Sequence, residues 1–228
     1  MENTILTVYF EGTSNALDEF VTQIGLFSAL TDAVNLLENS PTKSQRYYKI
    51  SYDGCGVTHG TSGVIFATGL MDQCREVQQR IHLLQSTGHE NITVNAIGLS
   101  RGGIAVIYLA QLLGNVLPDK VMLNLLLFDP VPGNLICTSR YLDPFSLFST
   151  ANYSLNLTSC RNINHVLALY PYQALPDLAF HAPLLPSYPA SCQVEEDAVL
   201  GCHQGALFCR RMTESRLSYV RIRDWLVD

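Results

Sequence analysis

The pentapeptide Gly98–Gly102, with the sequence Gly-Leu-Ser-Arg-Gly, constrains this chain more than any other segment, because it lies between two apolar segments of different kind. Residues 91–97 have β character, whereas residues 104–113 form an apolar stretch that suits a helix and stops at Gly114. A sharp turn between a strand and a helix requires glycine wherever a Cβ would clash with the neighbouring backbone. The sequence therefore predicts a strand–turn–helix unit with Ser100 at its apex.

Ser100 occupies the central position of a Gly-x-Ser-x-Gly motif in the context that this motif requires. In such an elbow, a strained backbone holds the serine hydroxyl above the sheet. The N-terminus of the following helix supplies N–H groups and a dipole that stabilise a developing oxyanion. Ser100 is therefore the candidate nucleophile.

The rest of the chain alternates between strand-like and helix-like segments, which is typical of an α/β fold with a mostly parallel central sheet and helices on both of its faces. The run Val121–Phe128 is almost continuously apolar, as expected of a strand buried on both sides. Residues 1–228 suit one domain, with a lid or cap excursion expected over the irregular segment 130–164. Further strands are expected at 5–10, 46–52, 165–170 and 194–200, and helices at 16–37 (with a break at Gly25), 64–84 and the tail from 204 to 228.

Composition excludes several classes of protein. The formal net charge is −6, which argues against a nucleic-acid partner. No apolar stretch approaches the roughly 20 residues of a membrane-spanning helix, and the segment 1–10 has a strand-like pattern in place of signal-peptide features. Seven cysteines form an odd set without a Cys-x-x-Cys pair, which favours reduced thiols and folding in a cytosol. No pattern specifies an oligomeric state.

A serine nucleophile needs a base and an acid that orients the base, and in this fold they follow in the chain order Ser, Asp or Glu, His. Asp129 comes directly after the buried run Val121–Phe128, where open α/β sheets place their sites. His203 follows the last predicted strand in a Gly-flanked loop. Asp129 and His203 are therefore the preferred acid and base. The alternatives are Asp177, Glu195, Glu196 and Asp197 for the acid, and His165 and His181 for the base.

The oxyanion hole of such a site pairs the N–H after the nucleophile with one from an early strand-to-helix loop. Arg101 fills the first role, and Gly12 or Thr13 the second. A metal site formed by Asp53, Cys55 and His59 has suitable atoms but no recognisable ligand spacing, so no metal or cofactor is expected.

Four segments together resemble the α/β-hydrolase domain best known from bacterial type VI secretion lipase effectors, whose members carry a GFSRG elbow. Phe10–Asn15 is similar to its FDGT-x-N segment, and Tyr52–Val57 to its YDGVGT. Gly98–Gly103 resembles GFSRGA, and Leu200–His203 resembles the PGVH that contains the catalytic histidine. The segment Phe128–Gly133 departs from the family's WDTVG pattern, but it is similar to the LDPA segment that carries the triad aspartate in pancreatic-type lipases.

The resemblance implies hydrolysis of phospholipid or related acyl-lipid esters, at a membrane surface, by an effector that is delivered into another cell without a cleaved signal peptide and can form part of a longer protein. Glu11 replaces the family's aspartate, Leu99 its phenylalanine, and Gln204–Ala206 its SDVGGG run, and these departures concern the substrate more than the reaction. Two alternatives remain open: an esterase or thioesterase for a soluble acyl substrate, and a catalytically silent domain that binds a partner.

Overall fold

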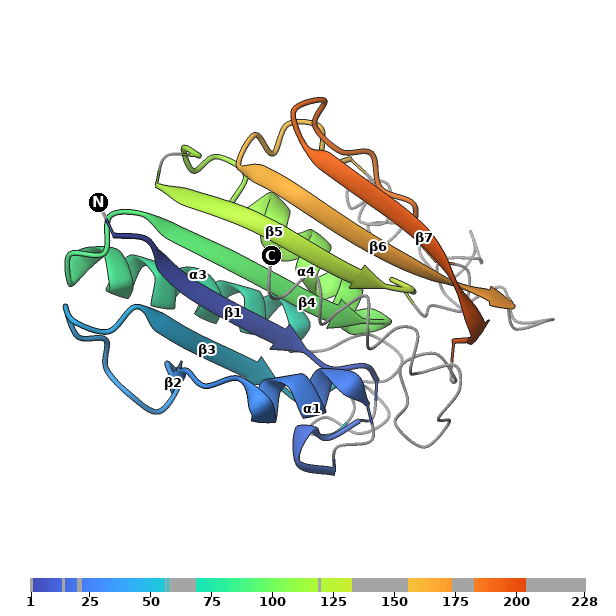
Figure 1. Cartoon of the computed structure of the whole chain (residues 1–228), viewed down its shortest axis with the longest axis horizontal. Helices are drawn as coiled ribbons and strands as arrows, with labels where there is room; N and C mark the ends of the chain where they lie inside the picture. The colour runs from blue at the N-terminus through green and yellow to red at the C-terminus, as the bar shows by residue number, and fades with distance from the viewer. Residues whose placement is uncertain are drawn as a thin grey trace.

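A single parallel sheet organises the described part of the chain. The computed structural model describes residues 2–13, 15–19, 22–55, 57, 69–118, 120–132, 156–173 and 183–203. Their strands form a seven-stranded sheet in the order β2-β3-β1-β4-β5-β6-β7, with every neighbouring pair parallel (Figure 1). The strands are β1 (Thr4–Phe10), β2 (Val34–Asn35), β3 (Tyr47–Tyr52), β4 (Ile92–Leu99), β5 (Val121–Phe128), β6 (Ile163–Gln173) and β7 (Gln193–Cys202). The predicted α/β class with a parallel central sheet is confirmed.

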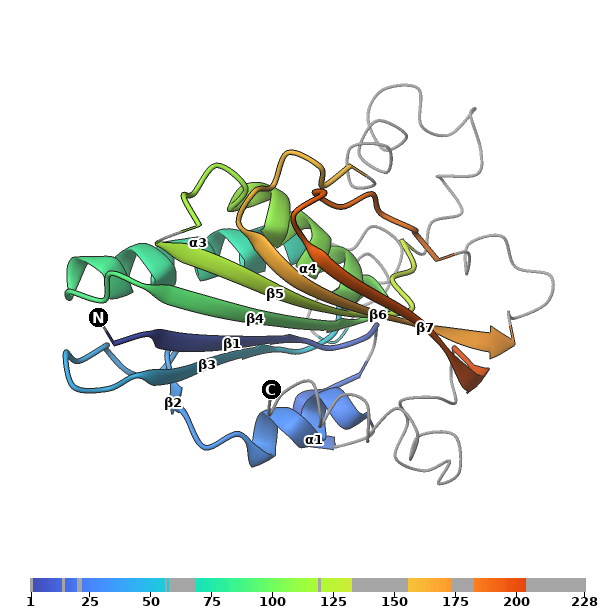
Figure 2. The same cartoon turned by 45° about the horizontal axis from the view of Figure 1, so that its top comes forward.

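Helices cover both faces of this sheet. With the sheet seen nearly edge-on in Figure 2, α3 (Leu70–Ser86) and α4 (Arg101–Leu112) lie on one face and α1 (Gln23–Leu30) lies on the other. A short 3₁₀ turn, η1 (Leu17–Glu19), precedes α1. Among the described residues, no helix is both long enough and apolar enough to cross a membrane.

Alternate side chains of the strands belong to two separate hydrophobic cores, one on each face of the sheet. Leu125 and Leu127 of β5 belong to the larger core, which also contains residues of α3 and α4. Leu126 and Phe128 belong to the smaller core, together with Ile24 and Phe27 of α1. The period-two alternation of strand side chains therefore buries β5 on both faces, as its continuous apolar run predicted.

The predicted helix over 16–37 is correct only in part: a helix covers residues 23–30, and the expected break at Gly25 is wrong because Gly25 lies inside that helix. The structure has η1, the eight-residue α1 and the short strand β2 in its place. A threonine lies at each end of α1. At the N-cap, Thr22 accepts a hydrogen bond from the Gly25 N–H, and at the C-cap, the Thr31 hydroxyl donates to the Phe27 carbonyl, 2.7 Å away. Such side-chain bonds to the backbone compete with helix continuation, and the apolar spacing of the segment does not reveal them.

The other boundaries agree within a few residues where the structure describes them. The strands predicted at 5–10, 46–52, 91–97, 165–170 and 194–200 correspond to β1, β3, β4, β6 and β7, and the helix at 64–84 corresponds to α3. Most of the expected lid, residues 133–155, and the predicted tail helix lie outside the described residues. At the two ends of the lid segment, Val131 is buried, and the Leu157 N–H donates to the carbonyl of Ser187.

Candidate active site

Ser100 lies at the apex of a strained turn between β4 and α4. Its φ of 56° and ψ of −117° fall outside the regions that side-chain-bearing residues normally occupy. The Ser100 N–H donates to the Phe128 carbonyl at 2.9 Å, and the Ser100 carbonyl accepts from the Ile104 N–H. These bonds fix the apex between β5 and the first turn of α4, so that the surrounding structure maintains the strain.

Glycine is required on both sides of the turn. A Cβ added at Gly98 would come within 2.2 Å of the Gly102 carbonyl oxygen, and a Cβ at Gly102 would come within 2.2 Å of the Phe10 carbonyl oxygen. Both obstacles are backbone atoms, which cannot move aside as a side chain can. The elbow thus packs directly against the end of β1, which explains physically why both glycines of the pentapeptide are needed.

The Ser100 hydroxyl has no structural role among the described residues. Ser100 is the N-cap of α4, yet its side chain makes no capping hydrogen bond, although serine is a preferred cap elsewhere. The residue is 5% exposed. No hydrogen bond joins Ser100 to His203 in this structure. Catalytic hydrogen bonds are often long without substrate and tighten when it binds.

Asp129 stands at the end of β5, level with Ser100 at the end of the adjacent strand β4. The register pairs Leu99 with Phe128, and each of the two site residues directly follows one member of that pair. Asp129 has a φ of 42°, its N–H donates to the Leu169 carbonyl at 2.9 Å, and it is 3% exposed. The short polar side chain of aspartate tolerates this left-handed conformation better than most residues do.

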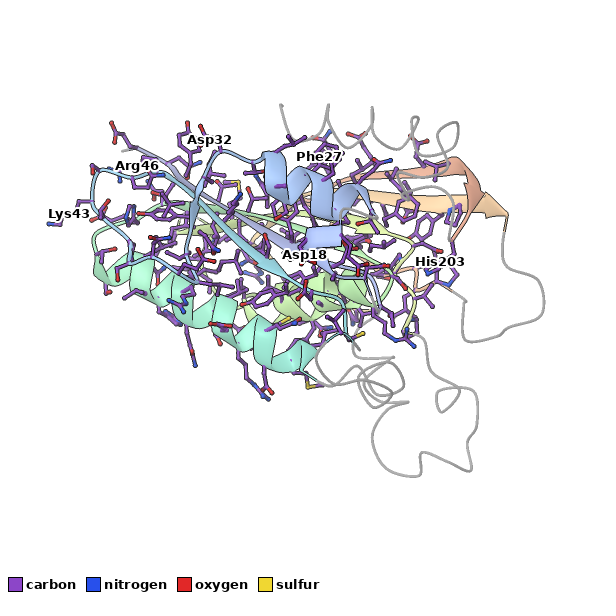
Figure 3. All side chains as sticks on the ribbon, turned by 90° about the horizontal axis from the view of Figure 1, so that it is seen from below. Asp18, Phe27, Asp32, Lys43, Arg46 and His203 are labelled. Carbon is purple, nitrogen blue, oxygen red and sulfur yellow. The ribbon has the colours of Figure 1, made fainter. Side chains whose placement is uncertain are left out.

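His203 follows β7 and hydrogen-bonds to Asp129, with Nδ1 of the ring facing Oδ2 of the carboxylate. Figure 3 places the labelled His203 at the opposite end of the molecule from Arg46 and Lys43. This is the carboxyl end of the strands, where open α/β sheets form their sites. A carboxylate on Nδ1 fixes the tautomer in which Nε2 can accept a proton.

The alternative base His165 lies elsewhere. In β6 it is level with Asn124, five residues before Asp129, which corresponds to about 16 Å along a strand. Its Nε2 lies 3.2 Å from Oε1 of Glu195, one of the alternative acids, so these two residues pair with each other. Glu196 and Asp197 are exposed in β7. His181, Asp177 and His59 lie outside the described residues.

The early loop lies beside the elbow, as an oxyanion hole requires. Nη1 of Arg101 donates to Oγ1 of Thr13 at 2.6 Å, and this bond ties the residue after Ser100 to the loop after β1. Among the described residues, no acceptor is found for the Thr13 N–H. The Gly12 N–H instead donates to Oε1 of Glu11 at 2.8 Å. Of the two predicted donors in this loop, Thr13 is therefore the better placed.

Two residues after β3, Asp53 and Gly54, shape this loop, although no pattern in the sequence indicates that role for them. Oδ1 of Asp53 accepts the Leu17 N–H at 2.9 Å, and the Gly54 N–H donates to the Asn15 carbonyl at 3.0 Å. A Cβ at Gly54 would come within 1.7 Å of the Gly12 carbonyl oxygen. The loop after β1 and the turn after β3 thus meet at Gly12 and Gly54.

Burial controls the protonation of the polar groups around the elbow. It raises the pKa of the Cys55 thiol, which lies 3.6 Å from Oγ1 of Thr13, so this cysteine is a poor competing nucleophile at neutral pH. It also lowers the pKa of the Arg101 guanidinium. Among the described residues, no group of three or more His, Cys, Asp or Glu side chains could hold a metal ion.

Comparisons with known proteins find similar structures at low identity. An arylesterase shares 15% identity over 95% of this chain and 72% of its own, with a TM-score of 0.49. Est1E from Butyrivibrio proteoclasticus shares 11% identity over 100% and 88% of the two chains, with a TM-score of 0.47. An esterase from a marine microorganism shares 11% identity over 99% and 95%, with a TM-score of 0.43. No protein-family model and no curated protein sequence matches the chain. Likenesses of this size identify neither a reaction nor a substrate.

Proposed function

We propose that this protein is a serine hydrolase that cleaves carboxylic esters, with Ser100 as nucleophile, His203 as general base and Asp129 as the acid that orients the base. The observation that carries the proposal is the arrangement of three side chains at the carboxyl end of the strands. A serine hydroxyl without a structural role stands on a strained elbow, level with an aspartate that hydrogen-bonds to a histidine.

The reaction would proceed through an acyl-enzyme. His203 takes the proton of the Ser100 hydroxyl as Oγ attacks the ester carbonyl, and Asp129 stabilises the imidazolium that forms. Backbone N–H groups of Arg101 and Thr13 hold the oxyanion of the tetrahedral intermediate. The alcohol leaves with the proton from His203. Water, deprotonated by the same histidine, then releases the acid and restores Ser100.

A fluorophosphonate probe and a short p-nitrophenyl ester test this proposal together. Wild type should become labelled and should hydrolyse the ester, whereas Ser100→Ala should do neither. His165→Gln is the matched control, since it removes a histidine of β6 that pairs with Glu195 away from the elbow, and it should behave as wild type. Folded wild type that neither reacts with the probe nor cleaves any ester would overturn the proposal.

The finer part of the proposal is that the acyl substrate is a lipid and that the protein acts as a delivered effector. Its support is the resemblance of four segments to the type VI lipase effectors, and the early-loop segments among them meet beside the elbow. Phospholipid liposomes and short soluble esters separate the lipid substrate from a soluble one. Faster turnover of the soluble esters, with none on liposomes, would favour the esterase or thioesterase alternative.

A further inference from the structure

The carboxylate of Glu11 is buried directly behind the loop that would form the oxyanion hole. It is 3% exposed and has hydrogen-bond partners on both oxygens. Oε1 accepts the Gly12 N–H at 2.8 Å, and Oε2 accepts the hydroxyl of Thr22 at 2.5 Å. The Gly25 N–H, in the first turn of α1, also hydrogen-bonds to this carboxylate. Glu11 thus joins the loop after β1 to the N-terminus of α1, where a negative charge is favourable.

These bonds fix the orientation of the Gly12 backbone. Its N–H is turned inward to Glu11, while its carbonyl accepts from the Asn15 N–H at 3.1 Å and packs against Gly54. The next N–H along the chain, that of Thr13, has no acceptor among the described residues. The Thr13 side chain meanwhile receives the Arg101 hydrogen bond. The Thr13 N–H can therefore donate to an oxyanion, whereas the Gly12 N–H already donates to Glu11.

We propose that Glu11 is a positioning residue that holds the Gly12 N–H away from the substrate, so that the Thr13 N–H faces the oxyanion together with that of Arg101. This role rests on the ester hydrolysis proposed above. In this role, Glu11 affects catalysis through the loop, without contact with the substrate. The role also accounts for a buried hydrogen-bond acceptor at this position, because the Gly12 N–H donates to it.

The protonation of Glu11 bears on how the role can be tested. Burial raises its pKa to about 7, and the charge of Asp53 acts in the same direction, whereas hydrogen bonds from Thr22, Gly12 and Gly25 oppose the shift. No side chain of α1 is titratable. A protonated Glu11 can donate to the Thr22 hydroxyl and still accept from Gly12. Glutamine should therefore preserve the loop, while methionine, which is of similar size, offers the Gly12 N–H only a weakly accepting thioether sulfur.

Steady-state kinetics on Glu11→Met and Glu11→Gln test the role. Glu11→Met should lower kcat by about 10- to 100-fold with KM unchanged, because the lost interaction acts on the transition state. Glu11→Gln should stay within about 3-fold of wild type, since both hydrogen bonds are preserved. Thr31→Val is the matched control, because it removes a hydroxyl at the other end of α1, bonded to Tyr9 at 2.6 Å, and should leave kcat unchanged.

A second measurement, by NMR, does not depend on turnover. The Gly12 amide resonance of wild type should shift with pH around 7, and in Glu11→Gln it should not. In Glu11→Met, the Gly12 amide should lose its protection from hydrogen exchange. If Glu11→Met does not fold, Thr22→Val, which removes the partner of Oε2 together with the N-cap of α1 but leaves the acceptor of the Gly12 N–H, should show a smaller loss of kcat at unchanged KM.

The outcomes separate the two proposals. Wild-type kcat in Glu11→Met, with Ser100→Ala inactive, would overturn the role of Glu11 and leave the hydrolase standing. Absence of Ser100-dependent hydrolysis in wild type would overturn the hydrolase, and the Gly12 amide would then show whether Glu11 holds the loop at all. An equal loss of kcat in Glu11→Met and Thr31→Val would reduce Glu11 to a structural residue and overturn the inference.

Discussion

Asp129 accepts a hydrogen bond from Nδ1 of His203 although a whole strand, β6, separates the strands that these residues follow. The two are 74 residues apart in sequence, and the carboxylate is almost fully buried while the imidazole is 15% exposed. A buried carboxylate that holds one ring nitrogen leaves the histidine in a single tautomer. This bond therefore favours the tautomer in which Nδ1 carries the proton that faces Asp129 and Nε2 has the lone pair that can accept a proton.

Asp129→Asn should lower kcat by about 10⁴-fold with little change in the fold, because the amide can stabilise the wrong tautomer of His203 and cannot stabilise an imidazolium. Glu195→Gln is the matched control, since it alters the other carboxylate–histidine pair of the described residues, Glu195 with His165. It should leave kcat unchanged. Ester hydrolysis over a range of pH, with circular dichroism to monitor folding, measures both. Similar kcat values for the two variants would contradict an orienting role for Asp129.

The sequence predicted the elements of this site better than their connections. Ser100 could be proposed because its turn lies between a recognisable strand and helix, and Asp129 because it ends a continuous apolar run. The structure brings Asp129 and His203 together, and their catalytic roles stay predictions. The bond from Arg101 to Thr13 spans 88 residues, and the bond from Leu17 to Asp53 spans 36. Only the folded sheet creates such contacts, and local periodicity does not encode them.

The burial of Glu11 is another feature that local sequence patterns do not encode. In the sequence, Glu11 lies in a cluster of turn-forming residues, where acidic side chains are common and are usually exposed to solvent. In the structure it is buried, because the loop after β1 folds under the N-terminus of α1. The start of α1, inside the range 16–37 predicted as one helix, and the role proposed for Glu11 both depend on Thr22, which caps α1 and bonds to the carboxylate.

Replacing the nucleophile should reveal the strain of the elbow. Ser100→Gly and Ser100→Ala both remove the hydroxyl, but glycine adopts a φ of 56° with a ψ of −117° readily and alanine does not. Strain of this kind costs about 1–3 kcal/mol, and the extra freedom of glycine in the unfolded chain offsets part of the relief. Ser100→Gly should therefore be the more stable of the two inactive variants by about 1 kcal/mol in urea unfolding. Equal stabilities would mean that the turn is relaxed.

The packing of the elbow against β1 predicts a graded response to added methyl groups. Gly102→Ala places a Cβ 2.2 Å from the Phe10 carbonyl oxygen, a backbone atom at the end of the central strand β1. Gly103→Ala meets the Cβ of Pro130 at 2.9 Å, a side-chain atom in the segment after β5 and outside the sheet. Overpacking costs about 1–3 kcal/mol and more where nothing yields, so Gly102→Ala should lose about 3 kcal/mol or fail to fold, and Gly103→Ala about 1 kcal/mol. Denaturant midpoints give the order, and the reverse order would contradict the close approach.

The buried carboxyl of Glu11 should make the stability of the protein depend on pH in a direction opposite to that of most acidic residues. Its pKa rises from an ordinary value of 4.5 to about 7 in the folded protein, mainly because burial disfavours the charge. Its contribution to stability is therefore complete below pH 4.5 and is lost as the pH rises through 7. A shift of this size corresponds to about 3 kcal/mol.

Glu11→Gln has no carboxyl to ionise, so its free energy of unfolding minus that of wild type should increase by about 3 kcal/mol between pH 4 and pH 9. Taking the difference cancels every other titrating group that the two proteins share. Asp53→Asn provides the control for the neighbouring charge. Removing that charge should lower the pKa of Glu11 in the folded protein, so that the rise is smaller and is complete at lower pH, because Asp53 contributes to the upward shift. A difference that stays constant from pH 4 to pH 9 would show that the pKa of Glu11 is the same in the folded protein as in the unfolded chain, and would contradict the upward shift.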